Sequence, residues 1–576
     1  MAAWISSNPA RLLLALGLLC RLRAWTPWQA ANSSFIFTLQ RNGRALEKQA
    51  RKEVTKTMSK ILRFDCIVLG GGSAGVVLAA RLSEDAGRSV LLLEAGPTFR
   101  PSEAPQSVRD ASNLAPDPEL LWDDNAARPP NAPFELRARV LGGGSSINAT
   151  NFSRALPSDF TRWTARGLAG WSYEDVLPYY KKMETDHQGD PSLHGHSGPV
   201  RVRRFDYSEM TPSHVAFIET AKALGFPEID DFNGPDNFGV GRLKMNNENR
   251  TRLSTALTYL TDEVWRRDNL TIRGETLVDA VRFEQRRATG VRLIGGEEID
   301  ADIVVLAAGT LGSAAILLRS GIGPAADLAG LGIPVVADLP VGRHYMEQPA
   351  SVLLHATTPD KLGGTEPPVS VLLVARSGGR QDGPPDLHVL PTHMAGVVGA
   401  STKGTVVAVN VAVPRPEDEP RGRLTLTSRD ARTPPEIDFG LLRNPKDLEK
   451  LADCVELGRR IAATKPFSDY LNEEISPGPK IRSREEIKSF LREHLQTYTG
   501  HMTSSAPMGP DYDPRAVVDE NAKVRRVDGL YAGDASIMPD VPSVATNPTV
   551  ILMAEIVSDR IKAAHAAEVL VARSSS

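Results

Sequence analysis

The first residues whose types and spacing suggest chemistry lie in a glycine-rich turn near position 70. Three glycines follow the pattern Gly-x-Gly-x-x-Gly between an apolar run and a stretch of helical composition. Glycines allow a tight turn and let backbone N–H groups approach a pyrophosphate at the start of a helix. Glu94 follows about 20 residues later, where a carboxylate accepts hydrogen bonds from ribose hydroxyls. The pattern therefore predicts a dinucleotide site without identifying the dinucleotide. Its predicted binding residues are Gly70, Gly72, Ser73, Ala74, Gly75 and Glu94.

Positioning this turn requires a strand before it and a helix after it. The apolar run from Cys66 to Leu69 predicts a buried strand, the helix is expected to reach Leu82, and Val90 to Leu93 predicts a second strand. Residues 64–95 therefore predict one βαβ unit. From about 98 to 137 the chain is rich in Pro, Asn and Asp, which predicts a long loop of the kind that forms lids or binding segments.

Farther along the chain the pattern changes to short β-like runs. Between residues 367 and 428 these runs are broken by Gly and Pro, and Leu424 to Thr427 alternates as a half-exposed antiparallel strand does. Apolar residues then recur at helical spacing from Leu448 to Ile461, and a strand-turn-helix pattern returns from Leu530 to Ile561. The predicted fold class is α/β (α+β overall), with a Rossmann-like dinucleotide domain interwoven with a domain built on an antiparallel sheet with helices.

Length and composition limit the classes of function. At 576 residues the chain exceeds one simple core, and 41% hydrophobic and 24% charged residues are typical of a globular protein. The formal net charge of −3, without a basic block, argues against a nucleic-acid partner. The three cysteines form neither a disulfide framework nor a metal-ligand spacing, so we predict no bound metal.

The first 57 residues differ in composition and are left out of the fold prediction. They contain no acidic residue before Glu47, and their apolar run from Leu12 to Leu19 is far shorter than the roughly 20 residues of a membrane span. We therefore predict no integral membrane span. The segment is compatible with a mitochondrial transit peptide, a signal peptide or a translated upstream extension that ends before Met58. We favour the extension and a cytoplasmic location, whereas a real leader implies a mitochondrial or secreted protein.

A second glycine-rich segment carries a family resemblance. Residues 139–148, with three glycines and two serines, resemble the first signature of the glucose-methanol-choline (GMC) oxidoreductases. Residues 309–323 resemble the second signature, but Ala314 stands where the family usually has Pro or Ser. The resemblance implies FAD as the cofactor. It also implies three modules: mainly FAD-binding over 63–345, a substrate-binding cap domain over 346–497, and a C-terminal return into the FAD domain over 498–562.

The resemblance also implies which residues react and which bind the cofactor. His501 matches the active-site histidine of the family, and a neutral imidazole suits removal of a hydroxyl proton while a hydride leaves for flavin N5. Asn547 matches the position of a second His or an Asn, which would hold the substrate oxygen. Where some members attach FAD through a histidine this chain has Ile147, so we predict non-covalent FAD. The further implied cofactor-binding residues are Arg139, Gly143, Gly144, Ser145, Asn148, Ala149, Val278, Asp534, Ala535 and Asn547 itself.

The resulting hypothesis is FAD-dependent oxidation of a primary alcohol to an aldehyde, by a choline dehydrogenase-like or alcohol oxidase-like enzyme. The expected partners are a small-molecule alcohol and an electron acceptor, either oxygen or a quinone-type carrier. One alternative is a hydroxynitrile lyase-type flavoprotein on the same scaffold. A fatty-acid photodecarboxylase is less favoured, because Leu390 stands where those enzymes carry an arginine. The sequence fixes neither the substrate nor the oligomeric state.

Overall fold

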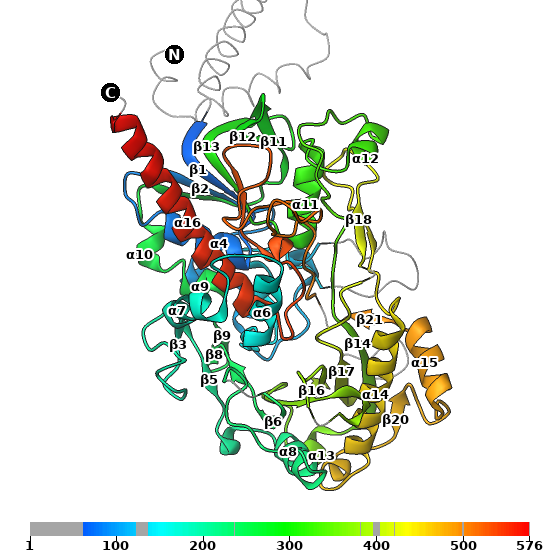
Figure 1. Ribbon diagram of the computed structural model, residues 1–576. Helices are drawn as coiled ribbons and strands as arrows, with labels where there is room; N and C mark the ends of the chain where they lie inside the picture. Colours follow the sequence, from blue (N-terminus) through cyan, green and yellow to red (C-terminus); the bar gives the residue numbers. More distant parts are fainter. Residues whose placement is uncertain are drawn as a thin grey trace, which may run out of the picture. The chain divides into compact units, whose positions relative to one another are not determined.

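The computed structural model of this chain describes residues 62–574, with short gaps, and its largest elements are two β-sheets of seven strands each (Figure 1). The gaps fall at residues 123–135, 235–236, 381, 396–403, 420 and 498–499. The predicted leader, residues 1–57, lies outside the described residues, as does part of the predicted long loop.

The first sheet has a parallel core and an antiparallel edge. Its strands run in the order β10-β2-β1-β13-β12-β11, and β22 pairs with β13. The pairings among β10, β2, β1, β13 and β22 are parallel, whereas those of β12 and β11 are antiparallel. Parallel strands are covered on both faces, which explains the buried apolar runs in the first two strands. The bounds are β1 (Leu62–Leu69), β2 (Val90–Leu93), β10 (Leu270–Arg273), β11 (Val278–Glu284), β12 (Arg287–Leu293), β13 (Glu298–Leu306) and β22 (Leu530–Ala532).

Helix α4 (Ser73–Leu82) connects β1 to the parallel strand β2 and begins directly after the glycine turn. It packs against both strands and against the C-terminal helix α16 (Asn547–Ser574), beside which it lies in Figure 1. The close approach of α4 to the glycine turn requires Gly75, because a Cβ atom there would lie 1.8 Å from the backbone oxygen of Gly70. The predicted βαβ unit is confirmed.

The second sheet is antiparallel throughout, as the sequence predicted. Its order is β20-β14-β17-β16-β15-β6, with β21 paired to β14. Strand β6 comes from inside the segment predicted to be mainly FAD-binding, so the two sheets are interwoven along the chain. The bounds are β6 (Gly239–Arg242), β14 (Pro349–Thr357), β15 (Val371–Ala375), β16 (Leu387–Ala395), β17 (Thr405–Ala412), β20 (Glu474–Ser476) and β21 (Gln496–Thr497).

Two helices, α14 (Pro445–Ala462) and α8 (Pro212–Ala223), pack against strands of the second sheet. Val389 on β16 and Val409 on β17 share a buried apolar cluster with Leu451 on α14. Because side chains alternate along a strand, the residues next to Val389 on β16 and next to Val409 on β17 face away from α14. The helix predicted from Leu448 to Ile461 is therefore confirmed, and its apolar stripe is what holds it on the sheet.

Shorter elements connect the two sheets. Other described helices are α5 (Gln106–Arg109), α6 (Pro157–Ala165), α7 (Tyr173–Met183), α9 (Thr255–Thr258), α10 (Asp262–Trp265), α11 (Gly309–Arg319), α12 (Ala325–Gly330), α13 (Pro359–Leu362) and α15 (Arg484–Glu493). Two-stranded pairs are β3 (Glu184–Thr185) with β4 (Val200–Arg201), β5 (Arg203–Arg204) with β7 (Lys244–Met245), β8 (Asn247–Glu248) with β9 (Thr251–Arg252), and β18 (Arg423–Thr425) with β19 (Glu436–Asp438). Among the described helices, none has the length and apolarity that a membrane crossing requires.

Candidate functional site

The two glycine-rich turns, although far apart in sequence, pack directly on each other. The backbone N–H of Gly142 donates to the carbonyl oxygen of Gly71 at 2.7 Å. The backbone N–H of Ser145 donates to the hydroxyl of Ser73 at 3.2 Å. The short 3-10 helix η4 (Gly143–Ser146) is thereby fixed against the start of α4. The structure thus brings the first and second predicted cofactor segments together.

The glycines in this contact divide into two kinds. Gly143 is a packing glycine, because a Cβ atom there would lie 2.7 Å from the Cα atom of Gly72. Gly144 is exposed and faces open space, with no atom of the other described residues, its two chain neighbours apart, within 4 Å of the place where its Cβ would stand. The place of a Cβ at Gly309, at the start of α11, is likewise open. The backbone at these two glycines is therefore accessible, as a cofactor that approaches the backbone closely requires.

Glu94 and Arg139 lie beside these turns. The carboxylate of Glu94, at the end of β2, accepts the N–H groups of Gly71 at 2.7 Å and Gly96 at 2.8 Å. Burial raises the pKa of Glu94, and these hydrogen bonds together with the charge of Arg139 oppose the rise. The Nε atom of Arg139 is buried and has no hydrogen-bond partner among the described residues. A buried donor without an acceptor is suited to an anionic ligand.

The remaining cofactor predictions fall at the ends of neighbouring elements. Val278 begins β11, and the segment before it is bonded to the end of β2 through the N–H of Thr276 and the carbonyl of Glu94 at 2.8 Å. The backbone N–H of Asn148 donates to the carbonyl oxygen of Gly144 at 3.0 Å. Ala149 instead packs against an apolar cluster of the second sheet. The first two therefore adjoin the turns, while Ala149 marks the border with the antiparallel domain.

Asp534 joins the C-terminal segment to α11. Its carboxylate accepts the N–H of Gly309 at 2.8 Å, the hydroxyl of Ser313 at 2.5 Å and the N–H of Ser536 at 2.8 Å. Burial raises the pKa of Asp534, and these three hydrogen bonds oppose the rise. The following residue, Ala535, opens the 3-10 helix η8 (Ala535–Ile537) and accepts the N–H of Ser504. The loop that contains His501 is therefore bonded to Ala535, the neighbour of Asp534, which is itself bonded to the start of α11.

His501 is held by two consecutive residues that the sequence analysis missed. Its backbone N–H donates to the carboxylate of Glu347 at 3.1 Å, and its Nδ1 atom lies 2.6 Å from Oε1 of Gln348. Burial lowers the pKa of His501 to about 4, so the imidazole is neutral at neutral pH. Glu347 and Gln348 lie just before β14. Gln348 is 153 positions before His501, so no local sequence pattern connects it with the histidine.

Asn547 is the first residue of α16, and its amide nitrogen Nδ2 is buried without a hydrogen-bond partner among the described residues. The loop before it is bonded to Gln348, whose Nε2 donates to the carbonyl oxygen of Val544 at 3.1 Å. One side chain therefore contacts both the histidine and the loop leading to the asparagine. A buried amide donor left unpaired is destabilising by about 1–3 kcal/mol, which favours a ligand acceptor at this place.

A second histidine, His388 on β16, also lies near His501 and was missed by the sequence analysis. Burial and the proximity of His501 lower the pKa of His388 to about 3. In the register of the sheet His388 pairs with Val374 and Ala412, and Ala412 pairs with Ala350. His388 alternates with Val389, which belongs to the cluster under α14. The opposite face of the antiparallel sheet is therefore the one that adjoins the histidine loop.

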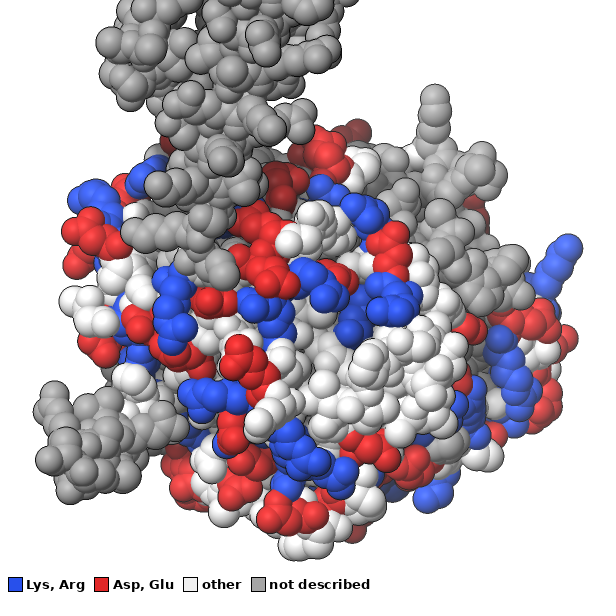
Figure 2. Space-filling view, turned by 90° about the horizontal axis from the view of Figure 1, so that it is seen from above, with Lys and Arg blue, Asp and Glu red and all other residues white. Residues whose placement is uncertain are grey.

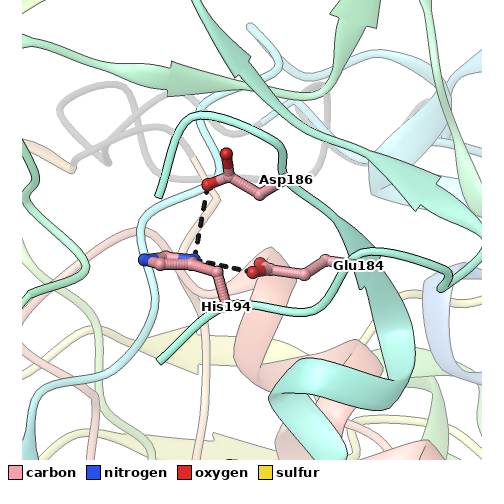
Figure 3. Close-up of side chains that lie close together, drawn as sticks. All are labelled: Glu184, Asp186 and His194. Atoms are coloured by element: carbon pink, nitrogen blue, oxygen red, sulfur yellow. Dashed lines mark hydrogen bonds and ion pairs between the residues drawn. The ribbon is translucent and has the colours of Figure 1, made fainter. Parts of the chain in front are cut away.

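A buried charged cluster has the composition of a metal site (Figure 3). Glu184, Asp186 and His194 offer ligand atoms that lie within 4.8 Å of one another. The Nδ1 atom of His194 is 2.7 Å from the carboxylate of Glu184 and 3.3 Å from that of Asp186. Burial alone lowers the pKa of His194, but hydrogen bonds to Asp231 and Glu184 outweigh it and raise the value.

Protein cations already neutralise these carboxylates. Lys244 forms ion pairs with Asp186 and with Asp231, the latter at 2.8 Å. Arg154 pairs with Glu184, and its side chain is almost fully buried. We therefore interpret the group as a salt-bridge cluster that joins β3, β7 and the segment between β3 and β4, and the sequence prediction of no bound metal stands as a prediction.

Lys244→Met is expected to lower the free energy of unfolding by about 3–5 kcal/mol, because it leaves buried carboxylates without their cation. The matched control is Lys465→Met, whose partner Asp469 is at the surface, with side chains 79% and 53% exposed. That change is expected to cost less than about 1 kcal/mol. Denaturant-induced unfolding of both variants measures the difference, and equal losses would contradict the interpretation.

Comparisons with known proteins match most of this chain. Residues 64–350 and 418–554 match two family models described as GMC oxidoreductase. An oxygen-dependent choline dehydrogenase of Photobacterium profundum is 32% identical over 536 residues, covering 86% of this chain and 93% of that protein. A 5-(hydroxymethyl)furfural oxidase of Methylovorus sp. is 34% identical over 534 residues, covering 86% and 98%. The crystal structure of pyridoxine 4-oxidase from Mesorbium loti matches with a TM-score of 0.76 and 28% identity, covering 86% and 99%.

The two matching regions contain both halves of the site. The N-terminal match includes the glycine turns, Glu94 and Gln348, and the C-terminal match includes His501, Asp534 and Asn547. Together they cover more than half of the chain, in the order in which the structure combines them. This chain therefore belongs to the GMC oxidoreductase family of flavoproteins.

Proposed function

We propose that this chain oxidises a primary alcohol to an aldehyde, with FAD as the oxidant and His501 as the base. The observation that carries the proposal is the place of His501, whose ring bonds to Gln348 in a loop that Thr310 of α11 holds, and whose pKa is lowered by burial. Two further observations support it. Asn547 offers a buried amide donor, and known relatives include a choline dehydrogenase and a 5-(hydroxymethyl)furfural oxidase.

The residues around the glycine turns fit FAD. Gly144 faces a space that a cofactor can fill, Arg139 supplies a buried donor for a phosphate, and Glu94 lies where ribose hydroxyls bind. When bound, FAD accepts the hydride that leaves the alcohol carbon. We propose non-covalent binding, because Ile147 offers no nucleophilic atom. Acid precipitation is then expected to release all of the flavin into solution, and a coloured pellet would contradict this.

The chain itself supplies a base and a hydrogen-bond donor for the substrate oxygen. His501 would take the hydroxyl proton, because its lowered pKa keeps the ring unprotonated over the physiological range. The amide of Asn547 would donate to the same oxygen and stabilise the negative charge that develops there as the proton leaves. Both groups are buried or half-buried, where such interactions are stronger than in water.

Asn547→Ala is expected to lower kcat/KM by about 10²–10³-fold, because one preorganised donor to the substrate oxygen is lost. The control is Asn444→Ala, since Asn444 also starts a long helix, α14, and accepts the N–H of Lys446 at 3.0 Å. Its loss is expected to cost about 1 kcal/mol of stability without a kinetic effect. Steady-state kinetics of both variants, with thermal unfolding, separate the two roles. A similar kinetic loss in Asn444→Ala would show that losing an asparagine at the start of a helix is enough to slow the reaction, and would contradict a direct contact between Asn547 and the substrate.

The direct test of the proposed function is an anaerobic titration of the purified holoprotein with primary alcohols. The panel contains choline, which carries a quaternary ammonium group, and benzyl alcohol, hydroxymethylfurfural and pyridoxine, which do not. Bleaching of the visible flavin band by one of them supports the proposal, and reoxidation by oxygen or a quinone then identifies the acceptor. A bound flavin that no alcohol reduces, in a protein that cleaves a cyanohydrin, would instead indicate a hydroxynitrile lyase.

A further inference from the structure

We infer that Gln348 is a positioning residue that holds His501 in a single tautomer, with the proton on Nδ1 and the basic lone pair on Nε2. The inference rests on the proposed function for the role of His501 as a base. It adds which ring nitrogen takes the substrate proton and which residue decides that choice. The hydrogen bonds around one buried amide lead to this assignment.

The orientation of the Gln348 amide follows from its neighbours. One terminal atom, Nε2, lies 2.9 Å from the carbonyl oxygen of Pro414, 2.7 Å from that of Pro542 and 3.1 Å from that of Val544. Carbonyl oxygens only accept hydrogen bonds, so the atom that faces three of them must be the amide nitrogen. A flipped amide would place its oxygen against three other oxygens in a buried site. The amide oxygen therefore faces His501.

The orientation of the amide determines the tautomer of the imidazole. Oε1 of Gln348 lies 2.6 Å from Nδ1 of His501. An amide oxygen has no hydrogen to donate, so Nδ1 must donate the hydrogen of this bond. A neutral imidazole has only one N–H, which leaves Nε2 as the unprotonated nitrogen. Nε2 is therefore the atom that receives the proton of the substrate hydroxyl.

The position of the ring is fixed together with its tautomer. Oε1 of Glu347 accepts the backbone N–H groups of His501 at 3.1 Å and of Gln348 at 2.9 Å. Two consecutive residues thus hold the backbone and the ring of the same histidine. Gln348 is fully buried, and its bonds to Pro542 and Val544 also hold the loop before Asn547. The base and the predicted oxygen-binding amide are therefore positioned by one side chain.

The uncharged amide has an electrostatic consequence. Among the described residues, Glu347 accepts the backbone N–H of His501, and the neutral His388 of β16 lies near it. A carboxylate at the Gln348 position would favour the imidazolium and raise the pKa of His501. The amide instead selects the tautomer without adding charge, so burial keeps the pKa of His501 near 4 and the base unprotonated.

The tautomer can be observed directly by NMR of the holoprotein labelled with ¹⁵N-histidine. The signals of His501 are identified by their absence in His501→Asn. Protonated Nδ1 and unprotonated Nε2 are expected in the wild type, and a mixture of tautomers in Gln348→Leu. Finding the proton on Nε2 in the wild type would overturn the inference.

Kinetics test whether the tautomer matters for the reaction. Gln348→Leu is expected to lower kcat about 10²-fold with little change in KM, as loss of a residue that orients a reacting group does. Gln348→Glu keeps an acceptor for Nδ1–H, but its second carboxylate oxygen meets the carbonyl oxygens of Pro414, Pro542 and Val544, so only part of kcat is expected to return. Its carboxylate is also expected to move the acid limb of the kcat profile to higher pH. If Gln348→Leu keeps the wild-type kcat, the orienting role is wrong.

Asn269, which is half-buried, provides a control for the loss of three hydrogen bonds from a side-chain amide to backbone carbonyls. Its Nδ2 atom donates to the carbonyl oxygens of Ser83, Asp85 and Arg88 at 3.1, 2.9 and 2.9 Å, the same type of contact as that of Gln348. Asn269→Leu removes these bonds without touching His501 and is expected to keep the wild-type kcat and pH profile. An equal kinetic loss in both leucine variants would show a merely structural role.

The proposed alcohol oxidation and the assigned tautomer of His501 can each be refuted without the other. If no alcohol reduces the flavin, the proposed oxidation is wrong, but the tautomer of His501 is still decided by the NMR measurement. If an alcohol reduces the flavin and the tautomer is the opposite one, the oxidation stands and the role of Gln348 is refuted.

Discussion

His501→Ala is expected to slow flavin reduction by the alcohol about 10²–10⁴-fold while leaving the amount of bound flavin unchanged. The physical reason is that the hydroxyl proton then has no acceptor when the hydride leaves, so the transition state loses its base. The loop that contains His501 is held by the hydroxyl of Thr310, which donates to the carbonyl of Met502, and by the hydroxyl of Ser505, which donates to the carbonyl of Thr310. Cofactor binding is therefore expected to survive the change.

Anaerobic stopped-flow measurement of flavin bleaching gives the rate for this variant. The control is His494→Ala, because His494 is an exposed histidine just after α15 whose ring stacks on Phe490. It is expected to react at the wild-type rate. Comparable rates in His501→Ala and the wild type would remove the base from the proposed mechanism.

Gly144→Ala is expected to yield a folded protein that binds FAD about 10²-fold more weakly. Apart from its two chain neighbours, no atom of the described residues lies within 4 Å of the added methyl group, so the fold itself has room for it. The methyl group instead extends into the open space beside Gly144, where the cofactor is proposed to lie. This substitution therefore separates cofactor binding from folding.

Circular dichroism and the ratio of flavin to protein absorbance measure the two effects. Gly330→Ala is the control, since it adds a methyl group in open space at the exposed end of α12. Gly75→Ala has the opposite expectation, because its methyl group would lie 1.8 Å from the carbonyl oxygen of Gly70 and must disrupt the turn itself. Full flavin content in Gly144→Ala would show that the cofactor does not occupy this space.

The cofactor half of the molecule was readable from the sequence because its signals are local. The glycine spacing from Gly70 to Gly75, the apolar strands on either side and Glu94 all lie within one βαβ unit, and the structure contains that unit. Strand alternation and helical spacing likewise predicted the antiparallel sheet and helix α14. In each case the pattern follows from the period of one element, which is fixed by backbone geometry.

The arrangement of the candidate site was decided by tertiary structure. His501 and Asn547 were identified by resemblance, but nothing in the sequence indicated that Gln348 contacts His501 and the loop before Asn547. The same holds for His388, which faces the site only because of the register of β16 against β17. Lys244 and its buried carboxylates are a further case, since their spacing suggests neither a metal nor a salt-bridge cluster.

The sequence by itself determined the elements, the family and the residue types available for chemistry. Only the tertiary structure decided which of them meet, how the Gln348 amide is oriented and which nitrogen of His501 is basic. The physical reason is that a hydrogen bond between side chains 153 positions apart has no period and no local signature. It forms because sheet register and core packing bring the two segments together, and because buried polar groups are costly unless each finds its partner.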